Sequence, residues 1–179
     1  SDKRILGLPE VQLGIHPGFG GTVRAVQIAG VRPAMQLMLT GKPITVGKGR
    51  KIGLIDRITG ADGWRDAARE LIASRPAKQT APLVERLLNL PIARPFIRSV
   101  LIKQVAGKAR KEHYPAPYAI IELWSRHGAS TRTGYEAEAR SIAELMCTST
   151  SRNLVRVFFL QNKLKGQGGK SAAKISHVH

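Results

Sequence analysis

The chain has few aromatic residues, one cysteine and few acidic side chains. Aromatic residues make up only 5% of its 179 residues, so the sequence offers no array of rings on which single-stranded nucleic acid could stack. Cys147 is the one cysteine, which excludes an internal disulfide and is compatible with a reducing compartment. The five histidines are spread too widely to form a metal-binding cluster with that thiol. We therefore expect no metal site.

Long hydrophobic runs are also lacking. The densest apolar patch, Val155 to Leu160, is far shorter than the roughly eighteen residues that a membrane-spanning helix needs. The first residues, Ser1 to Arg4, lack the apolar core of a signal peptide. The sequence does not begin with methionine, so we expect either processing or excision from a longer protein. The composition, 42% hydrophobic and 23% charged, is typical of a globular protein.

Positive charge is in large excess, with 29 Lys and Arg against 12 Asp and Glu and a formal net charge of +17. Such an excess attracts anionic partners, which include nucleic acids, phosphate-rich cofactors and acidic proteins. The basic residues extend from Lys3 to Lys174 without forming one block, which favours a solvated surface over a dedicated patch. No nucleic-acid-binding motif is present, so we expect no specific nucleic-acid partner. A basic nucleic-acid-binding protein remains the alternative.

Glycines, prolines and the spacing of apolar residues divide the chain near residue 60. We expect residues 1–60 to form a glycine-rich α/β part, 61–165 a helical part and 166–179 a linker. The first part is predicted to contain an extended segment over 5–14 that is broken at Pro9, a helix capped by Thr22, a helix after Gly30, a short helix capped by Thr45 and a strand over 53–58. The second is predicted to be helical over 64–75, 82–90, 95–111, 117–126, 134–146 and 149–164.

Two features of the first part are candidates for chemistry. Glu10 follows Pro9 in an apolar segment, and a carboxylate held among apolar neighbours can act as an acid or a base, although an exposed glutamate is the simpler alternative. The turn from Pro17 to Thr22 contains three glycines and would present free N–H groups at the start of a helix, which suits an anion or a polarised carbonyl. A turn that merely leads into the helix is the alternative there. We interpret His16 as a turn residue.

The order of three blocks is more specific than any single residue. Leu8–Arg24, Leu39–Ile44 and Ile52–Asp56 resemble, in order and spacing, segments of the enoyl-CoA hydratase (crotonase) family. The resemblance implies a truncated crotonase-like (ClpP/crotonase) fold followed by connector helices, which would make the chain mainly α with a small α/β N-terminal part.

In that family two glutamates position a water molecule and move protons as it adds to a trans-2-enoyl-CoA. The resemblance implies that Glu10 is one of these catalytic glutamates. The other glutamate and the oxyanion hole are expected upstream of Ser1, so we expect these 179 residues alone to be inactive. The implied substrate-binding residues are Pro17, Gly18, Phe19, Gly20 and Gly21.

The helical part resembles the connector of the multifunctional (trifunctional) fatty-acid oxidation α-subunits, on residues 95–98, 111–117 and 134–138. This implies β-oxidation, an acyl-CoA substrate, and a 3-hydroxyacyl-CoA dehydrogenase domain after His179 that would bind NAD. It further implies a thiolase β-subunit partner, an oligomer, and a cytoplasmic location in a bacterium or a mitochondrial one in a eukaryote. We expect no cofactor on residues 1–179 themselves. A purely structural docking role for residues 61–165 is an alternative.

Overall fold

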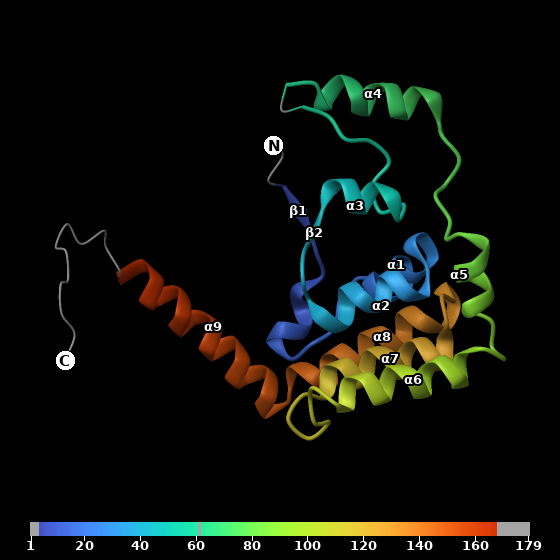
Figure 1. Ribbon diagram of the computed structural model, residues 1–179. Helices are drawn as coiled ribbons and strands as arrows, with labels where there is room; N and C mark the ends of the chain where they lie inside the picture. The colour runs from blue at the N-terminus through green and yellow to red at the C-terminus, as the bar shows by residue number, and fades with distance from the viewer. Residues whose placement is uncertain (1–3, 61, 168–179) are drawn as a thin grey trace.

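The computed structural model describes residues 4–60 and 62–167, and most of them are helical (Figure 1). The only strands in these residues are β1 (Ile5–Leu6) and β2 (Ile44–Thr45). They pair antiparallel, with Ile5 opposite Thr45. The expected fold class, mainly α with a small α/β part at the N-terminus, is confirmed.

The hydrophobic core joins the beginning of the chain to its later helices. Helices α1 (Gly21–Ala29) and α2 (Val31–Thr40) pack on α7 (Pro115–His127). Trp124 of α7 lies in this core, and its indole N–H donates a hydrogen bond to Asn89 Oδ1 over 2.9 Å. Removing α7 would therefore expose the inner face of both early helices. The buried residues of this core are Ala25, Val26, Val31, Ala34, Met35, Met38, Ile120 and Trp124.

The remaining helices surround this core. Figure 1 shows α6 (Arg94–Ala106), α7 and α8 (Thr131–Met146) side by side beneath α1 and α2. Helix α9 (Ser149–Gln167) begins next to this layer and then projects away from the body. The shorter helices are α3 (Val46–Lys51), α4 (Trp64–Ser74) and α5 (Leu83–Leu88).

The helices of the second part all form, with ends that shift by a few residues. The apolar stripe of α4 does not serve as a core face, because Trp64 is 57% exposed and Ile72 is 75% exposed. The predicted helix over 95–111 ends at Ala106, and the one predicted to start at Pro117 starts at Pro115. Proline lacks an N–H group, so it fits the first turn of a helix, where that group has no partner in the helix.

Two of the elements predicted for the first part are wrong. The extended segment predicted over 5–14 is broken at Pro9 as expected, but only Ile5–Leu6 form a strand, and Pro9–Leu13 form a 3-10 helix, η1. The strand over 53–58 does not form. Instead, Gly53 adopts a left-handed conformation with φ of 79°, and the N–H of Leu54 donates to Gly49 O. The start of this segment is thus a turn that follows α3, because the N–H groups of Gly53 and Leu54 donate to carbonyl groups of that helix and not to a neighbouring strand.

The two predicted caps have different outcomes. Thr45 caps α3, because its hydroxyl accepts a hydrogen bond from the N–H of Lys48. Thr22 does not cap α1, since it is the second residue of that helix and Gly20 occupies the capping position. The hydroxyl of Thr22 binds Glu138 instead.

Candidate functional site

Glu10 lies in η1, between α2 and the start of α9. The side chain of Gln12 donates to Gly41 O over 2.9 Å, which ties η1 to the end of α2. Gly14 ends η1 with φ of 74°, and a Cβ added there would lie only 3.0 Å from Ser151 Cα of α9. The Oε2 atom of Glu10 is buried and accepts no hydrogen bond from the described residues. The backbone around Glu10 is thus held from two sides, while one carboxylate oxygen lacks a partner.

His16 is fully buried six residues after Glu10. Its Nδ1 lies 2.9 Å from Pro17 O, which can only accept, so Nδ1 carries the proton. Its Nε2 lies 3.0 Å from Ser141 Oγ and therefore accepts from that hydroxyl. Burial lowers the pKa of His16, although the bond to Pro17 and the charges of Glu138 and Glu10 act in the opposite direction. A neutral imidazole with both nitrogens engaged is consistent with the interpretation of His16 as a turn residue.

The N–H groups of the glycine turn bind a carboxylate of the chain itself. Gly20 donates its N–H to Glu138 Oε1 over 2.5 Å, and Thr22 donates its N–H to Oε2 over 2.9 Å. The Thr22 hydroxyl donates to the same Oε2. Glu138 is only 3% exposed. The start of α1 does attract an anion, as its dipole and free N–H groups require, but the anion is Glu138 of α8.

The five residues predicted to bind substrate do not all face the same way. Pro17 and Gly20 are buried, and Gly18 and Gly21 are half-buried. Phe19 is 100% exposed. A Cβ on Gly21 would lie 2.7 Å from Pro17 Cβ, so packing inside the turn already requires glycine at that position. Substrate contact by these residues stays a prediction.

Glu138 and Ser141 are site residues that the sequence reasoning missed. Gly134, Glu138 and Leu145 are all buried on α8, so Glu138 lies on the packed face of the helix. The sequence signal that could have identified Glu138 is its spacing, because it lies at helical intervals from apolar residues and so shares the buried face with them. A carboxylate on a buried face needs hydrogen-bond donors. The residues around Glu138 in the sequence do not indicate which group it binds, because Thr22 is separated from Glu138 by 116 positions.

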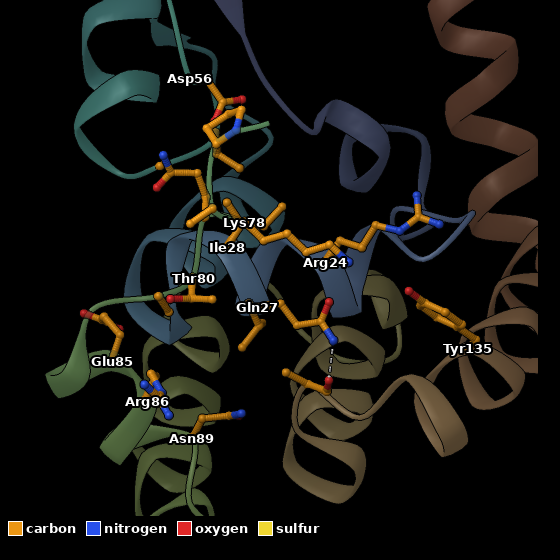
Figure 2. A pocket seen from close by; sticks show the side chains of 18 of the residues that line it. Arg24, Gln27, Ile28, Asp56, Lys78, Thr80, Glu85, Arg86, Asn89 and Tyr135 are labelled. Atoms are coloured by element: carbon orange, nitrogen blue, oxygen red, sulfur yellow. Dashed lines mark hydrogen bonds between the residues drawn. The ribbon is translucent and has the colours of Figure 1, made fainter. Parts of the chain in front are cut away.

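A pocket of about 950 Å³ lies between α1, α5 and the segment 76–81 (Figure 2). Figure 2 shows Tyr135 of α8 on one side and Glu85 of α5 on the other, with Arg24 and Lys78 between them. Arg24 lies over the Tyr135 ring at 5.8 Å from its centroid. The same ring lies 2.8 Å from the position of a Cβ on Gly20. Tyr135 thus lies between the pocket and the glycine turn, but neither Glu10 nor the predicted substrate-binding residues line the pocket.

Comparison with known protein families decides the assignment of this region. The sequence model of the enoyl-CoA hydratase/isomerase family matches residues 1–115. The chain belongs to the enoyl-CoA hydratase/isomerase family. The matched residues of this hydratase/isomerase-type enzyme include Glu10 and the whole glycine turn. The residues of α8 that hold the turn lie outside the match, as does nearly all of α7.

Across 4–60 and 62–167, no three His, Cys, Asp or Glu side chains come together as they would to hold a metal ion. No helix in the same ranges combines the length and apolar character needed to cross a bilayer.

Proposed function

We propose that this chain contributes Glu10 to the hydration of trans-2-enoyl-CoA, which yields 3-hydroxyacyl-CoA. The observation that carries the proposal is the buried Oε2 atom of Glu10, which accepts no hydrogen bond from the described residues. Buried polar atoms are nearly always hydrogen-bonded, so this oxygen is able to accept a hydrogen bond from a group outside the described residues. In the proposed role it accepts from the reacting water. The position of Glu10 within the family match supports the same role.

The reaction explains why a carboxylate is needed at this position. The water oxygen forms a bond to the β-carbon while the π electrons of the double bond move toward the thioester oxygen. A carboxylate takes the proton that the water loses, and a proton is then added to the α-carbon. One group on the water and one proton source for the α-carbon account for two carboxyl groups in such a site. Glu10 is proposed as one of them.

The developing charge on the thioester oxygen needs preorganised N–H donors. The N–H groups of Gly20 and Thr22 are not available for this purpose, because Glu138 accepts both. We assign the donors and the second carboxylate to the part of the domain expected upstream of Ser1. Accordingly, residues 1–179 alone are proposed not to hydrate enoyl-CoA.

The parent protein is proposed to be a multifunctional fatty-acid β-oxidation enzyme. The resemblance of the connector residues 95–98, 111–117 and 134–138 supports this. An NAD-binding 3-hydroxyacyl-CoA dehydrogenase domain, a thiolase partner and a cytoplasmic or mitochondrial location belong to the same proposal.

The test uses the full-length protein with the substitution Glu10→Gln. Hydration of crotonyl-CoA, followed by loss of enone absorbance, should fall by about a thousandfold, because acid–base catalysis typically contributes between a hundredfold and ten-thousandfold. NAD reduction with 3-hydroxybutyryl-CoA should persist. Glu112→Gln, which changes an exposed carboxylate, is the matched control and should leave both rates unchanged. Unchanged hydration by the Glu10 variant would remove Glu10 from the mechanism.

A further inference from the structure

We propose that Glu138 is a positioning residue for the hydration site, which fixes the glycine turn and thereby the position of the η1 backbone that carries Glu10. The proposal rests on the proposed role of Glu10 in hydration. It assigns a function in the reaction to α8, a helix outside the residues that the family model matches.

The carboxylate of Glu138 is bonded to the turn through both of its oxygens. Oε1 accepts from the N–H of Gly20, and Oε2 accepts from both the N–H and the hydroxyl of Thr22. Among the described residues, no Lys or Arg forms an ion pair with it. Burying a carboxylate without a cation is unfavourable unless hydrogen bonds compensate, and here every compensating donor comes from the turn. Carboxylate and turn therefore fix each other's position.

The same face of α8 contacts the turn at several successive levels. Residues 134, 138, 141 and 142 are separated by three or four positions, so they lie on one side of the helix. A Cβ on Gly134 would lie 2.7 Å from Val23 Cγ2, so the two helices approach closely there. Ser141 binds His16, and Ile142 Cδ1 lies 3.0 Å from the position of a Cβ on Gly18. The turn is thus held along its length and not at a single point.

The turn is connected directly to Glu10. The N–H of Ile15 donates to Glu10 O over 3.3 Å, and His16 follows at once. His16 is itself held against the first residue of the turn, because its Nδ1–H donates to Pro17 O over 2.9 Å. A displacement of the turn would therefore be transmitted to η1. A displacement on the order of 1 Å at a catalytic group costs about a hundredfold in rate.

The experiment measures crotonyl-CoA hydration by the full-length protein carrying Glu138→Ala, Glu138→Gln, Thr22→Val or Thr22→Ser. Glu138→Ala should lower kcat by about a hundredfold and change KM by a smaller factor, since displacing the turn moves the backbone that carries Glu10. Thr22→Val, which removes one of three bonds, should lower kcat less. Thr22→Ser keeps the hydroxyl that binds Glu138, so its kcat should equal that of the wild type. Glu136→Gln is the matched control, because Glu136 is exposed on the same helix and pairs with Arg140.

Each outcome decides one of the two proposals. If Glu10→Gln abolishes hydration while Glu138→Ala retains wild-type kcat, or raises only KM, the positioning role is wrong and the proposed function stands. If Glu10→Gln retains hydration, the proposed function fails and the positioning role fails with it. Should Glu138→Ala not fold, the Thr22 pair decides, because valine and serine differ in the one hydroxyl that binds Glu138. Equal rates for Thr22→Val and Thr22→Ser would then overturn the positioning role.

Discussion

Glu85 of α5 stabilises the start of α2, and its removal should be costly for the fold. The first N–H groups of a helix have no partner within the helix, and Gly30 at the capping position of α2 has no side chain to accept from them. The Oε2 atom of Glu85 accepts from the N–H of Arg32 over 3.0 Å. Its Oε1 atom accepts from the Arg32 guanidinium over 2.6 Å. One buried carboxylate thus caps the helix and forms an ion pair with the same residue.

The two interactions differ in expected strength. Loss of a capping acceptor costs about 1 kcal/mol. Each buried methylene removed by truncation to alanine adds about 0.8 kcal/mol. The ion pair contributes only about 0.5 kcal/mol, because exposed pairs are weak and the Arg32 side chain is 68% exposed. We expect Glu85→Ala to lower the free energy of unfolding by about 2 to 3 kcal/mol and Arg32→Ala by about 0.5 kcal/mol.

Urea unfolding of the two variants, followed by circular dichroism, measures this difference. A protein of this size loses about 2 to 4 °C in Tm per kcal/mol, so thermal unfolding offers an independent reading. Glu70→Ala removes an exposed carboxylate paired with Arg57 and serves as the control. Equal losses for Glu85→Ala and Arg32→Ala would refute the reasoning, since the ion pair and not the cap would then dominate.

Three further predictions concern the stability of the fold. Burial lowers the pKa of His16 below 6.5, so the unfolded chain takes up a proton before the folded chain does as pH falls, and the free energy of unfolding should decline from about pH 6.5 toward the lowered pKa. Urea unfolding at pH 7.5 and 5.5 measures this decline, and His16→Asn should remove the part of it that His16 causes. Equal declines for wild type and His16→Asn would contradict the prediction. Gly20→Ala should destabilise by more than about 1 kcal/mol, because φ is 82° and the new Cβ would lie 2.8 Å from an aromatic ring of α8; a wild-type Tm would exclude this. Gly47→Ala should raise the free energy of unfolding by about 0.5 kcal/mol, because a Cβ at that position meets nothing within 4 Å. Gly49→Ala should bring no gain, because its Cβ would lie 2.4 Å from Leu6 Cδ1. Equal shifts in Tm for the two variants would argue against this difference.

The parts of the fold that the sequence predicted are those set by local chemistry. Gly30 separates α1 from α2, where the sequence predicted a helix to begin after it, and it adopts a positive φ value that favours glycine. Thr45 caps α3 through a bond that spans only three residues. Such signals act between neighbours in the chain, so they can be recognised without knowledge of the packing.

The wrong predictions arise where distant residues decide. The residues after Gly53 have β-branched side chains suited to a strand, but a strand needs a partner, and this segment bonds to the end of α3. Thr22 has the chemistry of a helix cap, yet the carboxylate of Glu138 engages its hydroxyl from α8. The position of Glu10 in a matching motif and the helix over 134–146 were predictable, whereas the contact of that helix with the glycine turn was not.

The most direct test of the catalytic role of Glu10 separates binding from chemistry in the full-length protein. Single-turnover hydration of crotonyl-CoA and the affinity for the unreactive butyryl-CoA are measured for wild type and Glu10→Gln. We predict a rate constant lowered by about a thousandfold with an unchanged Kd for butyryl-CoA, because the carboxylate acts on the water and not on the thioester. A wild-type rate constant for the Glu10 variant, or a loss explained entirely by weaker butyryl-CoA binding, would contradict it.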